Sequence, residues 1–249
     1  MMSYAEGHAA YMAELAAIIE TDRAHERKIV AIGECGLDYD RLHFAQAGVQ
    51  EKAFDMQLTL AEKVQLPLFL HSRAAHQDFV RILRPHLEML RRAFHLTTPP
   101  SLEEEGSVGV VHSFTGTKEE LDELLSLGLY IGVNGCSLKT QENLDVVRHI
   151  PLHRIMLETD APWCEIRATH ACAPLLDKFK KAEPALAALY SPSRVKAERW
   201  TQTSAVKARN EPCAIGQVAA VVAQLKDVHL QDVATCALHN TQRLLGVAP

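Results

Sequence analysis

Short apolar runs alternate with longer amphipathic stretches along most of the chain. In the longer stretches apolar side chains recur every three or four residues, which predicts helices that bury one face. The short runs predict strands, because each is too brief for a helix and is bounded by turn residues or charges. The five predicted strands are 29–33, 67–70, 108–111, 129–133 and 155–159. This alternation is typical of β-α units and a parallel sheet.

Parallel strands with helical crossovers favour a (β/α) barrel over an open sheet. We predict an α/β fold, a TIM-type (β/α) barrel, since its strands are short and each is followed by a helical stretch. A doubly wound open sheet is the competing architecture, because strand order cannot be read from the sequence.

The C-terminal half departs from this alternation. Residues 163–209 contain prolines, many charges and little periodicity, which predicts a long basic loop region over the barrel mouth. Apolar spacing then returns and predicts two C-terminal helices within 214–249. The interpretation is a single β/α-barrel domain over residues 1–249.

Four of the five predicted strands lead directly into a side chain that binds metals. These side chains are Glu34, His71, His112 and Asp160. Taken singly, such a residue is most often a hydrogen-bonded structural group or a solvated loop residue. The carboxyl ends of parallel barrel strands converge on one mouth, however, so the joint pattern indicates a metal site.

The donor set limits the metal and the chemistry. Two imidazoles with carboxylate oxygens suit Zn²⁺, Mn²⁺ or Fe, whereas Mg²⁺ and Ca²⁺ prefer oxygen alone. Such a site activates water and polarises a phosphoryl oxygen. Other catalytic motifs are missing from the sequence, including G-x-S-x-G and the phosphate-binding glycine-rich loops. Cys35, next to Glu34, is interpreted as a packed thiol and not as a nucleophile.

Composition and charge indicate which partners the protein binds and where in the cell it is found. The chain has 249 residues, 47% of them hydrophobic, and a net charge of −5, which argues against a general nucleic-acid coat protein. Between residues 163 and 212, however, the chain has nine Lys and Arg but only five Asp and Glu. This local excess of positive charge attracts anions. Six cysteines without a C-x-x-C pair, and no signal peptide, predict a cytoplasmic or nuclear protein. We expect no membrane association, because no apolar run approaches the roughly 20 residues of a membrane span.

Several blocks of sequence resemble a known family. VAIGECGLDYDR at 30–41 resembles the signature G-E-x-G-L-D-[FY] of TatD-family deoxyribonucleases. PLFLHSR at 67–73, VVHSFTGT at 110–117 and LETDAPW at 157–163 agree with the same family in the same order. YIGVNGCSLKT at 130–140 is similar to its eukaryotic branch in particular.

The resemblance implies a TIM-barrel nuclease that uses divalent metal ions (Mg, Mn or Zn), one or two per chain, to cleave DNA. It implies that Glu34 bridges two ions, that His71 and His112 complete one site, and that Asp160 serves the other while activating water. Arg73 is then placed for the scissile phosphate and His170 for the DNA backbone.

One motif of the family is missing from this sequence. TatD proteins carry D-x-H-x-H on a first strand, whereas the only histidines before Glu34 are His8 and His25. The matching blocks therefore predict that about three N-terminal β-α units of the eight-unit barrel are missing. Two further hypotheses stay open: a truncated or catalytically impaired TatD-like protein, and a metal hydrolase that acts on a small molecule.

Overall fold

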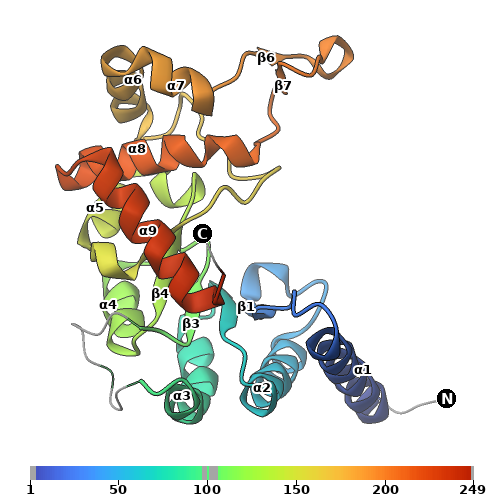
Figure 1. The fold of residues 1–249 in the computed structure, drawn as a ribbon. Coiled ribbons are helices and arrows are strands. Elements are labelled where there is room, and N and C mark those ends of the chain that lie inside the picture. The colour runs from blue at the N-terminus through green and yellow to red at the C-terminus, as the bar shows by residue number, and fades with distance from the viewer. Residues whose placement is uncertain (1–3, 97–99, 101–105, 248–249) are drawn as a thin grey trace. The chain divides into compact units, whose positions relative to one another are not determined.

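The computed structural model describes residues 4–96, 100 and 106–247. Two compact units make up the chain. The first consists of Met1–Val111, Glu123–Leu129 and Thr241–Pro249, and the second of His112–Asp122 and Tyr130–Asn240. Helices and parallel strands alternate in both, so the chain has the predicted α/β fold (Figure 1).

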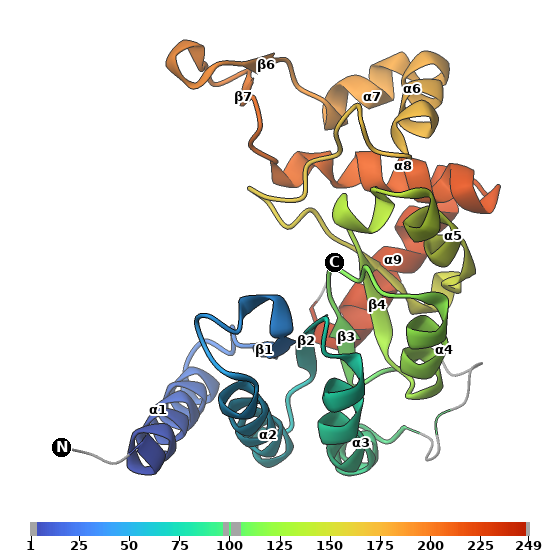
Figure 2. The ribbon, with the colours of Figure 1, turned by 180° about the vertical axis from the view of Figure 1, so that it is seen from behind.

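The first unit begins with a helix and then repeats a strand–helix pattern. Its helices are α1 (Tyr4–Ala24), α2 (Ala47–Val64) and α3 (His76–Ala93). Its strands are β1 (Ile32–Asp38), β2 (Leu68–Arg73) and β3 (Gly109–Val111). Strand β2 pairs in parallel with β1 and with β3, and the β1–β2 register shifts between Ile32 and Cys35. Because α2 and α3 are the crossovers between these strands, they pack side by side, as both views show (Figures 1 and 2).

The core of the first unit lies between this helix pair and the strands. Phe54 of α2 and Phe79 of α3 are both fully buried, and their rings stack with centroids 5.3 Å apart and planes 8° from parallel. Leu68 and Leu70 of β2 are also fully buried. The apolar positions that predicted these helices from their spacing are therefore the ones that hold them against the sheet.

The second unit carries the remaining strands and most of the C-terminal half. Strands β4 (Tyr130–Val133) and β5 (Ile155–Leu157) pair in parallel, with α5 (Gln141–His149) as their crossover. Helix α8 (Ile215–Lys226) packs against α5 and against α6 (Ala173–Ala182) and α7 (Pro184–Tyr190). Helices α4 (Lys118–Ser126) and α9 (Leu230–Leu245) each have residues in both units.

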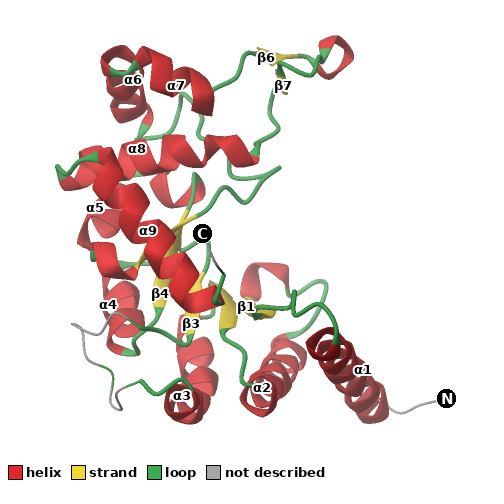
Figure 3. Cartoon of the chain, in the orientation of Figure 1, coloured by secondary structure: helices red, strands yellow, loops and turns green. Residues whose placement is uncertain are grey.

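The long basic segment is only partly a loop. Residues 163–209, predicted to lack regular structure, contain α6 and α7 (Figure 3). They also contain the two-residue strands β6 (Arg194–Val195) and β7 (Ala205–Val206), which pair in parallel. Leu176 and Phe179 of α6 are buried, so this helix does have an apolar face. The sequence pattern did not reveal that face, because charged residues dominate the segment. The position of this segment over a barrel mouth stays a prediction.

Strand positions were predicted correctly, but their limits were not. The first predicted strand, 29–33, begins three residues too early, and β1 runs through Glu34 to Asp38. Glu34 and His71 consequently lie within strands and not after them. The two C-terminal helices are confirmed as α8 and α9. Among the described residues, no helix combines the length and the apolar character needed to cross a membrane.

Candidate metal centre

Three of the predicted ligands lie close enough to hold one ion. Glu34, His71 and His112 each offer one ligand atom, and these atoms all lie within 4.8 Å of one another. Glu34 belongs to β1 and His71 to the neighbouring β2, while His112 is bonded to Val111, the last residue of β3. Consecutive strands thus supply one ligand each. Within the described part of the chain this is the one cluster of three or more such side chains, and Asp160 is not a member.

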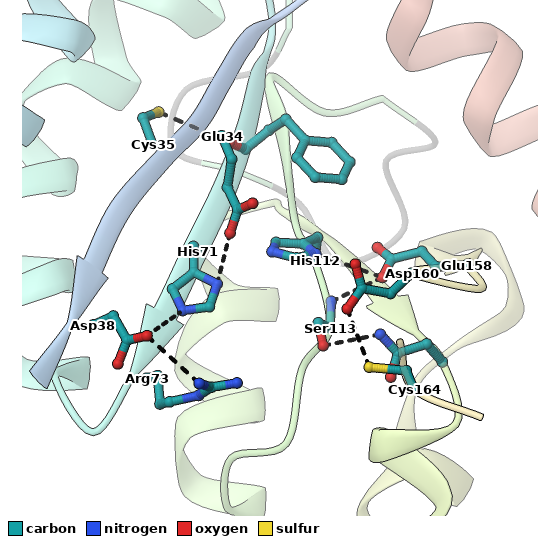
Figure 4. A network of polar contacts seen from close by, with 12 residues as sticks. Glu34, Cys35, Asp38, His71, Arg73, His112, Ser113, Glu158, Asp160 and Cys164 are labelled. Carbon is teal, nitrogen blue, oxygen red and sulfur yellow. Dashed lines mark hydrogen bonds and ion pairs between the residues drawn. The ribbon is translucent and has the colours of Figure 1, made fainter. Parts of the chain in front are cut away.

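Carboxylates lie at both nitrogens of the His71 ring. Nδ1 lies 2.9 Å from Glu34 Oε1, and Nε2 lies 3.6 Å from Asp38 Oδ2 (Figure 4). Arg73 Nη1 lies 3.5 Å from the same Asp38 oxygen. A carboxylate behind a metal-binding imidazole fixes the ring orientation and its tautomer, and raises the basicity of the ligand. Asp38 lies on this side of the His71 ring without a hydrogen bond to it, and Arg73 pairs with the same Asp38 oxygen.

A second carboxylate, Glu158, lies beside His112. Its Oε2 accepts a hydrogen bond of 2.9 Å from the Ser113 backbone N–H and lies 3.8 Å from His112 Nδ1. A Cβ at Gly132 would lie 1.8 Å from Glu158 Oε1 and 2.9 Å from the Cα of His112, so only glycine leaves room for this carboxylate. His112 itself is 8% exposed. Glu158 is therefore fixed in place beside the His112 ring.

We expect Glu158→Gln to weaken divalent-metal binding by roughly 10–100-fold, the usual effect of losing an outer-sphere partner of a ligand. The amide keeps the shape and still accepts from Ser113, but it removes the negative charge beside His112. Titration of the purified chain with Mn²⁺ measures the change. Glu198→Gln, an exposed change of the same kind, should leave the affinity unaltered. Unchanged affinity in Glu158→Gln would contradict a role for this carboxylate.

Asp160 lies in the second unit, beyond the end of β5. It is exposed, and its Oδ2 accepts a hydrogen bond of 3.1 Å from the Cys164 thiol. The Cys164 sulfur also accepts from the Cys136 thiol. The Cys136 contact, partial burial and the Asp160 carboxylate together raise the pKa of the Cys164 thiol. Asp160 and Cys164, like Ser113, have positive φ angles of 51–53°. Such backbone is sparsely populated for these residue types and clusters at functional sites.

Arg73 and His170 have different surroundings. The Arg73 side chain is 44% exposed and forms an ion pair with Asp38, so part of it has surface for a ligand. His170 is 9% exposed. Burial, with the positive charges of Lys139 and Arg167, lowers the pKa of its imidazole, which favours the neutral ring. The predicted contact of His170 with DNA backbone stays a prediction, and its burial leaves little surface for one.

Sequence reasoning did not assign roles to Asp38 and Glu158. Both stood inside the blocks that were compared with the family, and for Asp38 the strand pattern offered a signal. Asp38 follows Glu34 by four residues on one strand, and side chains at such even spacings share a face of a sheet. The parallel register then places Asp38 opposite Arg73 and Gly36 opposite His71. Glu158 had no such signal, because its function depends on Gly132 and Ser113, which belong to other segments.

A parallel α/β scaffold that carries Glu and His on two neighbouring strands and a second His directly after the third defines the class of protein as a metal-dependent hydrolase of the barrel type. Comparison with known proteins identifies the family. Residues 4–246 match the family described as TatD related DNase, and the chain belongs to that family.

Individual relatives agree with this assignment. "Deoxyribonuclease Tat-D" of Schizosaccharomyces pombe is 44% identical over 245 residues, which are 98% of this chain and 70% of that protein. "Deoxyribonuclease Tat-D" of Saccharomyces cerevisiae is 39% identical in an alignment of 244 residues that covers 90% of this chain and 58% of that protein. The chain thus spans 58–70% of the length of these relatives.

Solved structures share the fold. The crystal structure of an uncharacterized amidohydrolase from Saccharomyces cerevisiae has a TM-score of 0.80 and 36% identity, and covers 94% of this chain and 70% of the other. A hydrolase of the TatD family from Entamoeba histolytica has a TM-score of 0.75 and 31% identity, with coverages of 94% and 68%. The predicted TIM-type barrel fold is confirmed by these likenesses.

Proposed function

We propose that this protein is a divalent-metal-dependent nuclease that hydrolyses DNA phosphodiester bonds through metal-activated water. The observation that carries the proposal is the cluster of Glu34, His71 and His112, within 4.8 Å, in a chain of the TatD-related DNase family. Both yeast relatives are named deoxyribonucleases, which supports DNA as the substrate.

The donor chemistry of the cluster fits a divalent cation. One carboxylate and two imidazoles are ligands of the type that Mn²⁺ and Zn²⁺ take, and Mg²⁺ is the oxygen-preferring alternative. We propose one ion per chain at this cluster, held by Glu34, His71 and His112. A bound divalent ion lowers the pKa of a coordinated water toward neutrality and polarises a phosphoryl oxygen.

The other steps fall to side chains outside the cluster. Asp160 is an exposed carboxylate and is proposed to accept the proton of the attacking water. The guanidinium of Arg73 is proposed to bind the scissile phosphate, since a guanidinium matches phosphate oxygens in a bidentate fashion. Exposed lysines of α6 and of the segment after β7 supply further positive charge for the DNA backbone. They are Lys178, Lys180, Lys181 and Lys207. Backbone contacts of this kind carry no sequence information.

Degradation of DNA by the purified chain tests the proposal. We expect single- or double-stranded DNA to be cleaved when Mn²⁺ or Mg²⁺ is added and to stay intact in excess chelator. Binding to DNA should weaken steeply with salt, because each phosphate neutralised by Lys or Arg releases counterions.

Two results would contradict the nuclease. The first is a chain that binds Mn²⁺ yet leaves both forms of DNA intact, which would favour the catalytically impaired alternative. The second is metal-dependent hydrolysis of a small ester or amide without salt-sensitive DNA binding, which would favour the small-molecule hydrolase.

A further inference from the structure

Two cysteine thiols from separate segments of the second unit lie close to each other. The sulfurs of Cys136 and Cys164 are 3.1 Å apart. Cys136 opens the short 3₁₀ helix η2 (Cys136–Leu138) after β4, and Cys164 lies in the segment after β5. Both side chains are partly exposed, so reagents in solution reach them. The other four cysteines have no such sulfur neighbour among the described residues.

The segment that carries Cys136 is fixed by its own hydrogen bonds. The Cys136 backbone N–H donates to Asn134 Oδ1 at 2.9 Å, and Asn134 is fully buried. The Asn134 amide nitrogen donates in turn to Ser113 Oγ at 2.9 Å. The Asn134 backbone N–H donates to Ser137 Oγ at 3.2 Å, which closes the turn. Cys136 is therefore held in one place by a buried polar network.

The segment that carries Cys164 is fixed independently. The Trp163 backbone N–H donates to Asp160 O at 2.8 Å, and the Asn210 side chain donates to Thr159 O at 2.8 Å. The two cysteine segments also touch each other through their backbones, because a Cβ at Gly135 would lie 1.9 Å from the Cys164 carbonyl oxygen. Glycine at 135 is what permits this approach. The two thiols consequently face each other because of the packing of both segments and not by a chance rotamer.

We propose that Cys136 and Cys164 are a redox site that closes reversibly into an intramolecular disulfide. A disulfide bond is about 2.05 Å long, so the sulfurs must approach by roughly 1 Å. Small side-chain rotations supply a movement of this size. Strained or exposed disulfides have more oxidising potentials and are the labile, regulatory kind, in contrast to buried structural ones.

A disulfide oxidant of the glutathione type completes the reaction. One cysteine thiolate attacks a sulfur of oxidised glutathione, which breaks the S–S bond and releases one reduced glutathione. The second cysteine then attacks the mixed disulfide, which forms the Cys136–Cys164 bond and releases the second reduced glutathione. The protein loses two protons and two electrons, and the two glutathione molecules gain them.

Closure of the disulfide changes the surroundings of Asp160. In the reduced chain the Cys164 thiol donates its hydrogen to Asp160 Oδ2 at 3.1 Å. A disulfide sulfur has no hydrogen to donate, so oxidation frees this carboxylate oxygen. This consequence rests on the proposed function, in which Asp160 accepts a proton from water. The disulfide itself does not depend on nuclease activity.

Mass spectrometry of the whole chain after equilibration with glutathione tests the proposal. The chain is held in buffers of increasing ratio of oxidised to reduced glutathione until no further change occurs, since a protonated thiol such as Cys164 exchanges slowly. Remaining thiols are then alkylated and the protein is digested. We expect a linked pair of peptides containing Cys136 and Cys164, lighter by two hydrogen atoms than the two thiol peptides. Reduction should remove the link.

Matched serine variants identify the pair. Cys136→Ser and Cys164→Ser should each abolish the link, whereas Cys213→Ser, at an exposed cysteine elsewhere, should preserve it. The proposal is overturned if the most oxidising buffer gives only glutathione adducts, or a link that involves another cysteine. It is supported if the link forms, even where the same protein sample shows no cleavage of DNA, because that second result would count against the nuclease alone.

Discussion

We expect His71→Ala to lower the rate of metal-dependent DNA cleavage by at least about 100-fold, more than the loss of an outer-sphere partner. His71 is one of the three cluster residues, and its ring lies 2.9 Å from the ligand Glu34 Oε1 and 3.6 Å from Asp38 Oδ2 outside the cluster. Removal of the ring takes away one of three protein ligands and leaves Glu34 and Asp38 as neighbouring carboxylates without an imidazole between them. Metal affinity should therefore fall with the rate. Metal analysis of the purified variant and a DNA cleavage assay measure the two effects.

His239→Ala is the matched control for this variant. His239 is exposed on helix α9, where alanine suits the helix and no metal is predicted. It should bind metal and cleave DNA as the unchanged chain does. Retention of full nuclease activity in His71→Ala would rule out the cluster as the catalytic site, and retention of metal with loss of cleavage would assign His71 to the reaction alone.

The second large effect is on stability. We expect Phe54→Ala to lower the free energy of unfolding by about 3–5 kcal/mol, the usual result of removing a buried phenylalanine ring. Phe54 is fully buried and stacks on Phe79 at 5.3 Å between centroids, so alanine would leave a cavity between α2 and α3. The loss is a large part of the 5–15 kcal/mol that stabilises an ordinary domain. Urea unfolding followed by the helical circular dichroism signal measures it.

The control for stability is Phe44→Ala. Phe44 is 80% exposed, so the substitution should change the unfolding free energy by no more than about 0.5 kcal/mol. At low temperature and without urea, Phe54→Ala should still bind Mn²⁺, because the ligands lie on the strands and not on α2. A loss in Phe54→Ala below about 1 kcal/mol would mean that the helix pair does not support the strands as described.

Much of the fold was readable because hydrophobic spacing depends only on local sequence. The five strands and the helices between them each bury a set of apolar side chains, and the spacing of these residues in the sequence predicts that set. Strand limits were less accurate, because a charged residue such as Glu34 can continue a strand when its neighbours pair. Helix α6 was missed for a related reason, since Leu176 and Phe179 bury one face of a segment whose charges dominate its composition.

The candidate site was readable in part. Glu34, His71 and His112 were predicted as ligands from their places next to three apolar strands, and the structure brings their ligand atoms within 4.8 Å. The positions of Arg73 and Asp160 were equally visible, but their catalytic roles stay predictions. Asp38 and Glu158 were overlooked, because a carboxylate gains a positioning role only from the imidazole that lies beside it.

The sequence by itself determined the class of fold, the metal-binding residue types and the family, because periodicity and short motifs are local properties of the chain. The tertiary structure alone decided which groups surround those residues. It placed Asp38 Oδ2 3.6 Å from His71 Nε2, Glu158 over Gly132 beside His112, and the Cys136 and Cys164 sulfurs 3.1 Å apart. Each of these contacts joins segments distant in the sequence, and only packing fixes such distances.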